Sequence, residues 1–378
     1  MKICAIIAEY NPFHKGHMHH IKNVKKFADA IVIILTGHTT QRGEFSIFNK
    51  WTKTKSALFC GANLVLEIPT IFSSTSAQRF SSAAIKIIKE MNCINTLSFG
   101  SEIGKIEKIK EMAIICKNIE KTEEMKYHLK KGENYPKARE LAIGEKAEIL
   151  KYPNNLLAVE YIKAAMNLNC KISFHTIKRI GVNHDVLKPE ETASSLYIRK
   201  NIENIKKIEK FIPNRILKLY SDPIHIPDKF LLNSLRKKTK EEFKKIFDTT
   251  EGLHNRLFKF SKQATSLEEF LKLCKTKRYT LTRLKRIVIN SFLEIDMNKT
   301  TNLPQYSCVL GFDSIGRKIL NKIKKNKNFL FTTNFKEIYN KFNYSAKIDS
   351  SATDFILLFE KQPKPCGMNF KQKPIILC

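Results

Sequence analysis

Acidic residues are scarce in this chain of 378 residues, which has 36 Asp and Glu against 67 Lys and Arg. The formal net charge of +31 at pH 7 is far more than solubility requires, and it indicates a polyanionic partner. The alternative is that many lysines only cover solvated helix faces. Even then, the excess of basic residues leaves a positive field around the protein.

Paired cysteines and long apolar runs are also missing. The nine cysteines lie far apart and form no C-x-x-C, which argues against a disulfide framework or a zinc ribbon. No 18 apolar residues run together, and Glu9 and Asn11 interrupt the N-terminal apolar run too soon for a signal peptide. We therefore expect reduced thiols, a cytoplasmic location, no membrane span and no obligate protein partner.

Short apolar runs alternate with segments of helical spacing through the first half of the chain. The runs, rich in β-branched residues, are 2–8, 30–37, 64–69, 96–102 and 171–177. Strands separated by helices are typical of right-handed βαβ units, whose parallel sheet is covered on both faces. We predict an α/β, Rossmann-like fold with helices that include residues 17–28, 49–61, 81–91 and 154–166.

The pattern changes near residue 205, where charged helical segments begin. We place a domain boundary there and predict a first domain over residues 1–205 and a mainly helical, basic domain over residues 206–378. Near the end of the second domain, a small α/β appendage is predicted from the apolar runs 307–312 and 329–333 and the helix Ser314–Lys325 between them.

The segment EYNPFHKGHMHH, residues 9–20, lies between the first predicted strand and the first predicted helix. Ligands of open α/β sheets bind at this edge, where free amides at a helix N-terminus attract phosphate. Gly16 would allow close approach of a phosphate, and His14 and His17 could donate hydrogen bonds to phosphate oxygens as charge grows in the transition state. The alternative is that all three are ordinary turn and cap residues.

A second motif, SSLYIRK at residues 194–200, follows the acidic pair at 190 and 191. Ser194 and Ser195 could cap a helix and donate to phosphate, and Arg199 could place its guanidinium on phosphate oxygens. Taken alone, two serines before a helix indicate no more than a cap.

Together the two motifs resemble the HxGH and S-S/T-x-x-x-R pair of the nucleotidyltransferase superfamily. Further segments in the same order resemble the tRNA(Met) cytidine acetate ligase family: GHTTQRGE at 37–44, NKWTKTKSALFCGANLVLEIP at 49–69, SFGSE at 98–102, YPNNLLAVEYIKA at 152–164, IKRIGVNHD at 177–185, RYTLTRLKRIV at 278–288 and VLGFDSIGRKIL at 309–320. The resemblance implies an enzyme that activates acetate with ATP as acetyl-adenylate. It then acetylates N4 of the wobble cytidine of elongator tRNA(Met).

The resemblance also implies roles for residues. The positions of the family that contact ATP fall on Ile7, Ala8, Glu9, Tyr10, Asn11, Pro12, Phe13, His14, Lys15, Gly16, His17, Met18, His19, His20, Gly100, Asn154 and Arg179. Gly100 would permit close backbone approach, Asn154 would offer an amide, and Arg179 a fixed charge. The alternatives are a plain turn at Gly100, an N-cap at Asn154 and a solvated Arg179.

The loop after the second predicted strand carries Gln41, Arg42 and Glu44, which we assign to substrate binding. Here the chain departs from the family, which has Asn-Phe-Val before the QRGE and Pro after it. This chain has residues 38–40, His-Thr-Thr, and Phe45 instead, so the details of acetate and cytidine recognition are less secure than the role of the loop.

The second domain would hold the tRNA. Arg278, Arg283, Lys285 and Arg286 surround an aromatic residue, and we predict phosphate contacts there. The alternative is a solvated face of a packing helix. We predict no metal-ligand set, since successive histidines on a helix point in different directions, and Mg²⁺ would arrive with the phosphates of ATP.

Two other functions stay open. The HxGH motif also fits a nucleotidyltransferase that acts on a phosphorylated small molecule, although such an enzyme would not need a long basic second domain. The other alternative is a noncatalytic RNA-binding protein that retains this fold, for which loss of an HxGH residue would be the expected mark.

Overall fold

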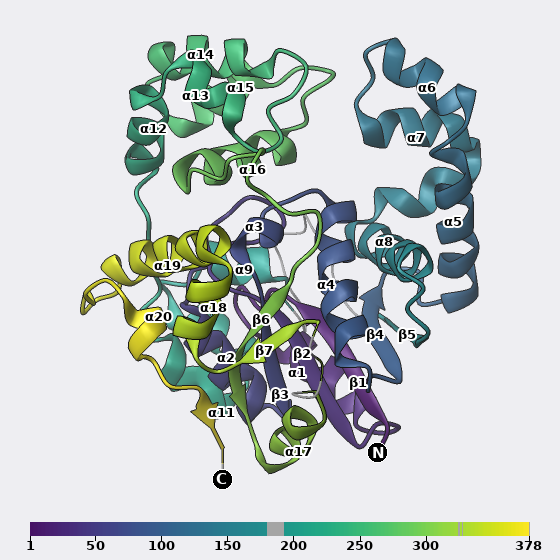
Figure 1. The fold of residues 1–378 in the computed structure, drawn as a ribbon, viewed down its shortest axis with the longest axis vertical. Helices are drawn as coiled ribbons and strands as arrows, with labels where there is room; N and C mark the ends of the chain where they lie inside the picture. Colours follow the sequence, from purple (N-terminus) through teal and green to yellow (C-terminus); the bar gives the residue numbers. More distant parts are fainter. Residues whose placement is uncertain (180–192, 324–325, 327, 378) are drawn as a thin grey trace.

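The computed structural model describes residues 1–179, 193–323, 326 and 328–377, and its centre is one eight-stranded sheet (Figure 1). The strand order is β5-β4-β1-β2-β3-β6-β7, and β8 pairs with β6. Strands β1 to β5 are mutually parallel, as the alternating pattern predicts. The strands are β1 Ile3–Ala8, β2 Ala30–Thr36, β3 Leu64–Ile68, β4 Thr96–Ser101, β5 Ser173–Lys178, β6 Tyr306–Phe312, β7 Leu330–Thr332 and β8 Ile375–Ile376.

Helices cover both faces of the sheet, which explains why all seven residues of β2 are buried. Val32 and Ile34 face a core built with α4 and α8, whereas Ile31 and Ile33 face a second core built with α1 and α2. This alternation is what a strand of period two requires when both faces are covered. The helices of this part are α1 Lys15–Val24, α2 Lys50–Phe59, α3 Thr70–Ser73, α4 Ala77–Met91 and α8 Pro153–Asn167.

A first helical lobe projects beside β4 and β5 (Figure 1). A buried chain of ion pairs supports it, since Arg139 pairs with Glu160 and Lys163 contacts both Glu160 and Glu120. The lobe comprises α5 Ile106–Ile119, α6 Glu123–Lys130, α7 Tyr135–Ile143 and the 3-10 helix Gly144–Lys151.

A second helical lobe has its own apolar core and lies above α3 and α19 in the view of Figure 1. It comprises α12 Asp228–Lys237, α13 Lys240–Lys245, α14 Leu253–Gln263, α15 Leu267–Cys274 and α16 Leu281–Phe292. The segment that leads to it contains α9 Ser195–Lys200, α10 Ile205–Ile208, α11 Asn214–Leu217 and 3-10 turns at Glu209–Phe211 and Lys218–Tyr220.

After α16 the chain returns to the sheet. The predicted appendage is confirmed as a parallel pair, β6 and β7, joined by α17, and β6 adds to the sheet antiparallel to β3. Sequence alone did not indicate this attachment. The last helices are α17 Ser314–Ile323, α18 Phe335–Lys341, α19 Asn343–Leu358 and α20 Met368–Lys371. The final residue of the predicted helix, 325, lies outside the described residues, and the boundary near residue 205 stays a prediction.

None of the helices in the described part of the chain combines the length and the apolar character that a membrane span requires.

The loop between β2 and α2 fastens the sheet to the second lobe. Gly43 has φ +77°, and a Cβ there would lie 2.3 Å from the backbone nitrogen of Arg286 in α16. Phe45 packs against Phe292 of α16 and Phe355 of α19, with ring centroids 5.8 and 5.1 Å away. The backbones therefore approach as closely as they do only because residue 43 has no side chain.

Replacing Gly43 with alanine should therefore destabilise the protein for two reasons, the left-handed backbone conformation and the clash of the added Cβ with α16. Gly367 is a matched control, because it has φ +83° and no atom within 4 Å of an added Cβ. Gly367→Ala measures the left-handed strain alone, roughly 1–2 kcal/mol. Gly43→Ala is expected to lower the free energy of unfolding further, as measured by urea denaturation. Equal losses in the two variants would contradict a close contact between loop and lobe.

Candidate functional site

His14 and His17 meet at the start of α1. His14 is the N-cap of the helix, and its Nδ1 accepts a hydrogen bond from the backbone N–H of Gly16 at 3.1 Å. Nδ1 of His17 accepts in turn from the backbone N–H of His14 at 3.2 Å, and the two rings stack with centroids 3.8 Å apart. Both Nδ1 atoms are thus used as acceptors, which leaves Nε2 as the nitrogen that can carry a proton.

Burial keeps both rings neutral. It lowers the pKa of His14 to about 3, with a further contribution from the charge of Arg179. Burial also lowers the pKa of His17 well below its ordinary value, helped by His14 and Arg179, although the residue as a whole is only partly buried. At neutral pH the pair therefore offers two neutral Nε2–H donors at the N-terminus of α1.

Packing against His14 gives a structural reason for glycine at position 16, in addition to the predicted approach of a phosphate. A Cβ at this position would lie 2.8 Å from Cε1 and 3.0 Å from Nδ1 of His14. Any larger residue would push the imidazole out of its capping position. Phosphate approach at Gly16 stays a prediction.

The other side chains of the segment between residues 7 and 20 point to several places. Glu9 accepts a hydrogen bond from the backbone N–H of Gln41 at 2.6 Å, which ties the first turn to the QRGE loop. His19 is exposed and contacts Asn23. The ring nitrogen Nε2 of His20 lies 2.8 Å from Ser98 Oγ on β4. Ile7, Ala8, Lys15 and Met18 are partly buried, whereas Tyr10, Asn11, Pro12 and Phe13 are buried.

Arg179 directly follows β5, the strand at one edge of the sheet, and its side chain joins this cluster. Its positive charge contributes to lowering the pKa values of His14, His17 and His20, which places the four side chains around one site. Gly100 lies beneath it, since a Cβ there would be 3.4 Å from Cγ of Arg179. Burial lowers the pKa of Arg179 itself, and the charge of a nearby carboxylate opposes that shift.

Asn154, at the start of α8, is held by Glu102. Its Nδ2 and its backbone N–H donate to Oε1 of Glu102 at 2.6 and 3.3 Å. The side chain is therefore oriented by a carboxylate and does not act as an N-cap, since Tyr152 is the N-cap of α8 and makes no capping bond.

The second motif, residues 194–200, has two structural roles: it caps a helix, and it links that helix to the first turn and the QRGE loop. Ser194 accepts a hydrogen bond from the N–H of Tyr197 at 3.1 Å, so it caps α9, and Ser195 is the first residue of that helix. Arg199 donates to the carbonyl of Asn11 at 2.8 Å and to Glu44 at 3.1 Å. The acidic pair at 190 and 191 and the part of the quoted motif from residue 180 to 185 lie outside the described residues.

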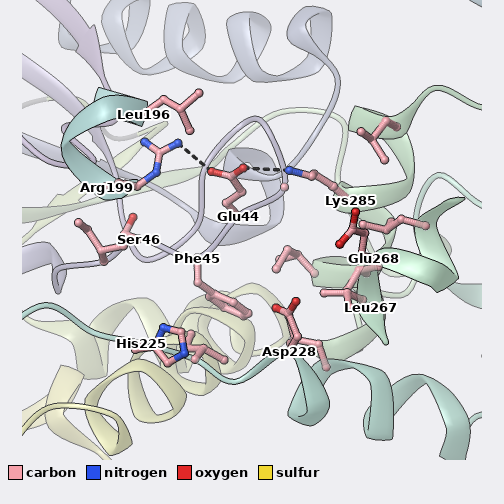
Figure 2. A pocket seen from close by; sticks show the side chains of 18 of the residues that line it. Glu44, Phe45, Ser46, Leu196, Arg199, His225, Asp228, Leu267, Glu268 and Lys285 are labelled. Carbon is pink, nitrogen blue, oxygen red and sulfur yellow. Dashed lines mark hydrogen bonds and ion pairs between the residues drawn. The ribbon is translucent and has the colours of Figure 1, made fainter. Parts of the chain in front are cut away.

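Glu44 connects three parts of the protein. Oε2 pairs with Arg199 of α9 and Oε1 with Lys285 of α16, both at 3.1 Å (Figure 2). Burial alone would raise the pKa of Glu44, but the charges of Arg199 and Lys285 outweigh it and lower the pKa. Gln41 donates from its side chain to the carbonyl of Thr75, which holds the other end of the loop. Arg42 lies close enough to influence the pKa values of Glu44 and Arg179.

The basic residues predicted to contact RNA have different surroundings. Arg283 and the buried Arg286 both pair with Asp248, at 3.1 and 3.7 Å. Arg278 lies 3.9 Å from Glu251 and is partly exposed, as is Lys285. RNA contacts at these positions stay predictions.

Sequence reasoning missed a buried polar layer beneath the QRGE loop. Lys53 donates to the carbonyl of Gly37 at 2.6 Å and to Ser46 at 3.1 Å, so one ammonium holds both ends of the loop. Lys50 pairs with Glu67 at 2.8 Å. Burial lowers the pKa of Lys53 to about 7. The available signal was a carboxylate inside the apolar strand LVLEI and two lysines three residues apart on α2.

A cavity of about 730 Å³ has Glu44 in its wall (Figure 2). Residues of the QRGE loop, α9, the segment before α12, α15 and α16 line it. Sequence could not reveal it, because its walls come from segments more than 200 residues apart. It is therefore a product of the way the second lobe docks on the sheet.

Comparison with known proteins places this geometry in context. Residues 1–371 match the family described as HIGH Nucleotidyl Transferase. Proteins named tRNA(Met) cytidine acetate ligase from Caldicellulosiruptor saccharolyticus and Clostridium tetani are 36% and 33% identical to the chain; the matches cover all of this chain and 99% and 100% of those relatives. The crystal structure of Thermotoga maritima TmcAL bound with alpha-thio ATP is 29% identical, with a TM-score of 0.91 and full coverage of both chains.

The depressed pKa values of three histidines predict how stability depends on pH. His14, His17 and His20 have folded pKa values below the 6.5 of an unfolded histidine, about 3 for His14 and His20. As the pH falls below about 6.5, the unfolded chain takes up protons that the folded chain refuses, so stability decreases. Urea denaturation at several pH values measures this loss. His20→Asn should give a shallower loss than His128→Asn, a partly exposed control on α6; identical slopes would contradict the shifted pKa of His20.

Proposed function

Since the chain belongs to the tRNA(Met) cytidine acetate ligase family, we propose that it joins acetate to the α-phosphate of ATP and then acetylates N4 of the wobble cytidine of elongator tRNA(Met). In the first step an acetate oxygen bonds to the α-phosphorus while the bond to the β-phosphate oxygen breaks and pyrophosphate leaves. In the second step N4 attacks the acetyl carbon, AMP leaves, and N4 loses a proton.

The observation that carries the proposal is the pair of neutral imidazoles at the N-terminus of α1. Their Nε2–H groups can donate to phosphate oxygens without the cost of keeping a buried cation, and Arg179 supplies the fixed positive charge beside them. Donors fixed before reaction stabilise the charge that develops as pyrophosphate departs. Catalysis by these residues is then electrostatic, with no covalent enzyme intermediate.

Mg²⁺ would accompany the nucleotide. Within the described residues, no group of three or more His, Cys, Asp or Glu is arranged to hold a metal ion. Mg²⁺ bound with a nucleotide usually takes most of its ligands from the phosphates and from water. The protein's own contribution would be to orient the phosphates through His14, His17 and Arg179.

Radiolabelled acetate tests the whole proposal. Supplied with ATP and total tRNA, the protein is expected to place label in the RNA, and nucleoside mass spectrometry should identify N4-acetylcytidine. Omission of ATP is the control. Nucleotide transfer to a phosphorylated small molecule without acetylation of RNA would instead support the other nucleotidyltransferase reaction. RNA binding with no turnover of any kind would support a noncatalytic protein.

His17 and Lys22 offer a contrast within one helix. His17→Ala is expected to lower acetate-dependent exchange of label between pyrophosphate and ATP by about 100-fold or more, because it removes a donor to the leaving phosphate. Lys22 is exposed on α1 and lies outside the segment assigned to ATP, so Lys22→Ala should keep nearly full exchange. Thermal unfolding checks that both variants are folded. Equal activity of the two variants would remove His17 from the mechanism.

A further inference from the structure

We propose that the cavity of Figure 2 is the subsite for the acceptor nucleotide, with a cytosine base held inside and the neighbouring RNA phosphates at its rim. This inference rests on the proposed function, and it names the place from which the second substrate reaches the adenylate.

The position of the cavity supports this assignment. Arg199 lines the cavity and also donates to the carbonyl of Asn11, in the turn between β1 and α1. Ile47, another lining residue, donates its N–H to the side chain of Asn11 at 2.9 Å. A single layer of side chains thus separates the cavity from the turn that carries His14 and His17. A base held there is adjacent to the predicted nucleotide site and shares Arg199 with it.

The size and lining suit a flat heterocycle. A volume of about 730 Å³ lies within the range of small-ligand sites, and it accommodates a base with its ribose. Most of the wall is apolar, with Phe45 on the loop side, Leu196 from α9, and Leu231, Leu267 and Leu271 from the second lobe. RNA-binding sites commonly hold an unstacked base between such surfaces.

The polar groups favour cytosine over uracil. The carboxylates of Glu44, Asp228 and Glu268 line the cavity, and among the described residues neither Asp228 nor Glu268 forms an ion pair. Carboxylates accept hydrogen bonds from the N4 amine of cytosine, whereas uracil presents a carbonyl oxygen at the same position and would be repelled. Glu44 is linked to the turn with Asn11 through Arg199, which contacts both. It would act as a positioning residue that directs N4 toward that turn.

The rim carries the opposite charge. Lys200, Lys272 and Lys275 are exposed lining residues, and none of them forms an ion pair with another described residue. Together with Lys285 they make four cationic side chains among the lining residues. Phosphates on both sides of an inserted nucleotide would meet these lysines, and their contribution should depend on salt concentration.

Filling the cavity separates the two half-reactions. Leu281 lines the cavity and is exposed, so Leu281→Trp adds bulk there without disturbing the core, and Ile114→Trp on α5 is an exposed control. Leu281→Trp is expected to keep acetate-dependent pyrophosphate exchange but to reduce acetyl transfer to tRNA by about 100-fold, since misplaced reactants react slowly. Ile114→Trp should keep both. If Leu281→Trp lost as much pyrophosphate exchange as acetyl transfer, the cavity would be assigned to ATP. If it kept full acetyl transfer, the cavity would not be part of the acceptor site.

Reversing the rim charge tests the phosphate contacts independently. The double variant Lys272→Glu, Lys275→Glu should raise the KM for tRNA by about tenfold or more, with the largest effect at low salt. Lys117→Glu, Lys121→Glu makes the same change of net charge on exposed residues of the first lobe and should have a far smaller effect. An equal rise in KM for the two double variants would indicate only a general electrostatic attraction to tRNA and would overturn the assignment of the rim lysines. Absence of exchange in the unsubstituted protein would instead contradict the proposed function itself.

Discussion

The ion pairs of Glu44 with Arg199 and Lys285 are the contact on which the arrangement of the site depends. Arg199 extends the connection to the turn that follows β1, and Lys285 extends it to α16. The first turn, the QRGE loop and the second lobe are thereby fixed in relation to one another. Because all the partners are partly shielded from water, their charges interact more strongly than they would on an open surface.

Much of the fold could be predicted from the sequence. The short apolar runs separated by helical segments identified β1 to β5, since a sheet covered on both faces needs nearly continuous apolar strands. The attachment of β6 to β3 could not be predicted. It depends on pairing between segments about 240 residues apart, and no local pattern encodes such a partner.

The candidate site was predictable in composition but not in detail. The HxGH motif located the two histidines, yet their tautomer follows from backbone N–H groups that only the folded turn supplies. Gly16 illustrates the same limit, because its missing side chain makes room for an imidazole two residues earlier. Arg283 and Arg286 were predicted to contact RNA from their charge, and the structure adds an ion-pair partner for both, Asp248, about 35 residues earlier in the chain. Charge patterns identify a residue type without identifying its partner.

The antiparallel pairing of β6 with β3 has a consequence for biosynthesis. A ribosome makes β3 more than 200 residues before β6, so the edge of β3 spends most of translation without its neighbour. Unpaired strand edges rich in apolar residues invite association with other chains. Two strands and both helical lobes are made between β3 and β6. A chain cut short before residue 306 would leave this edge of β3 unpaired and open to association with other chains.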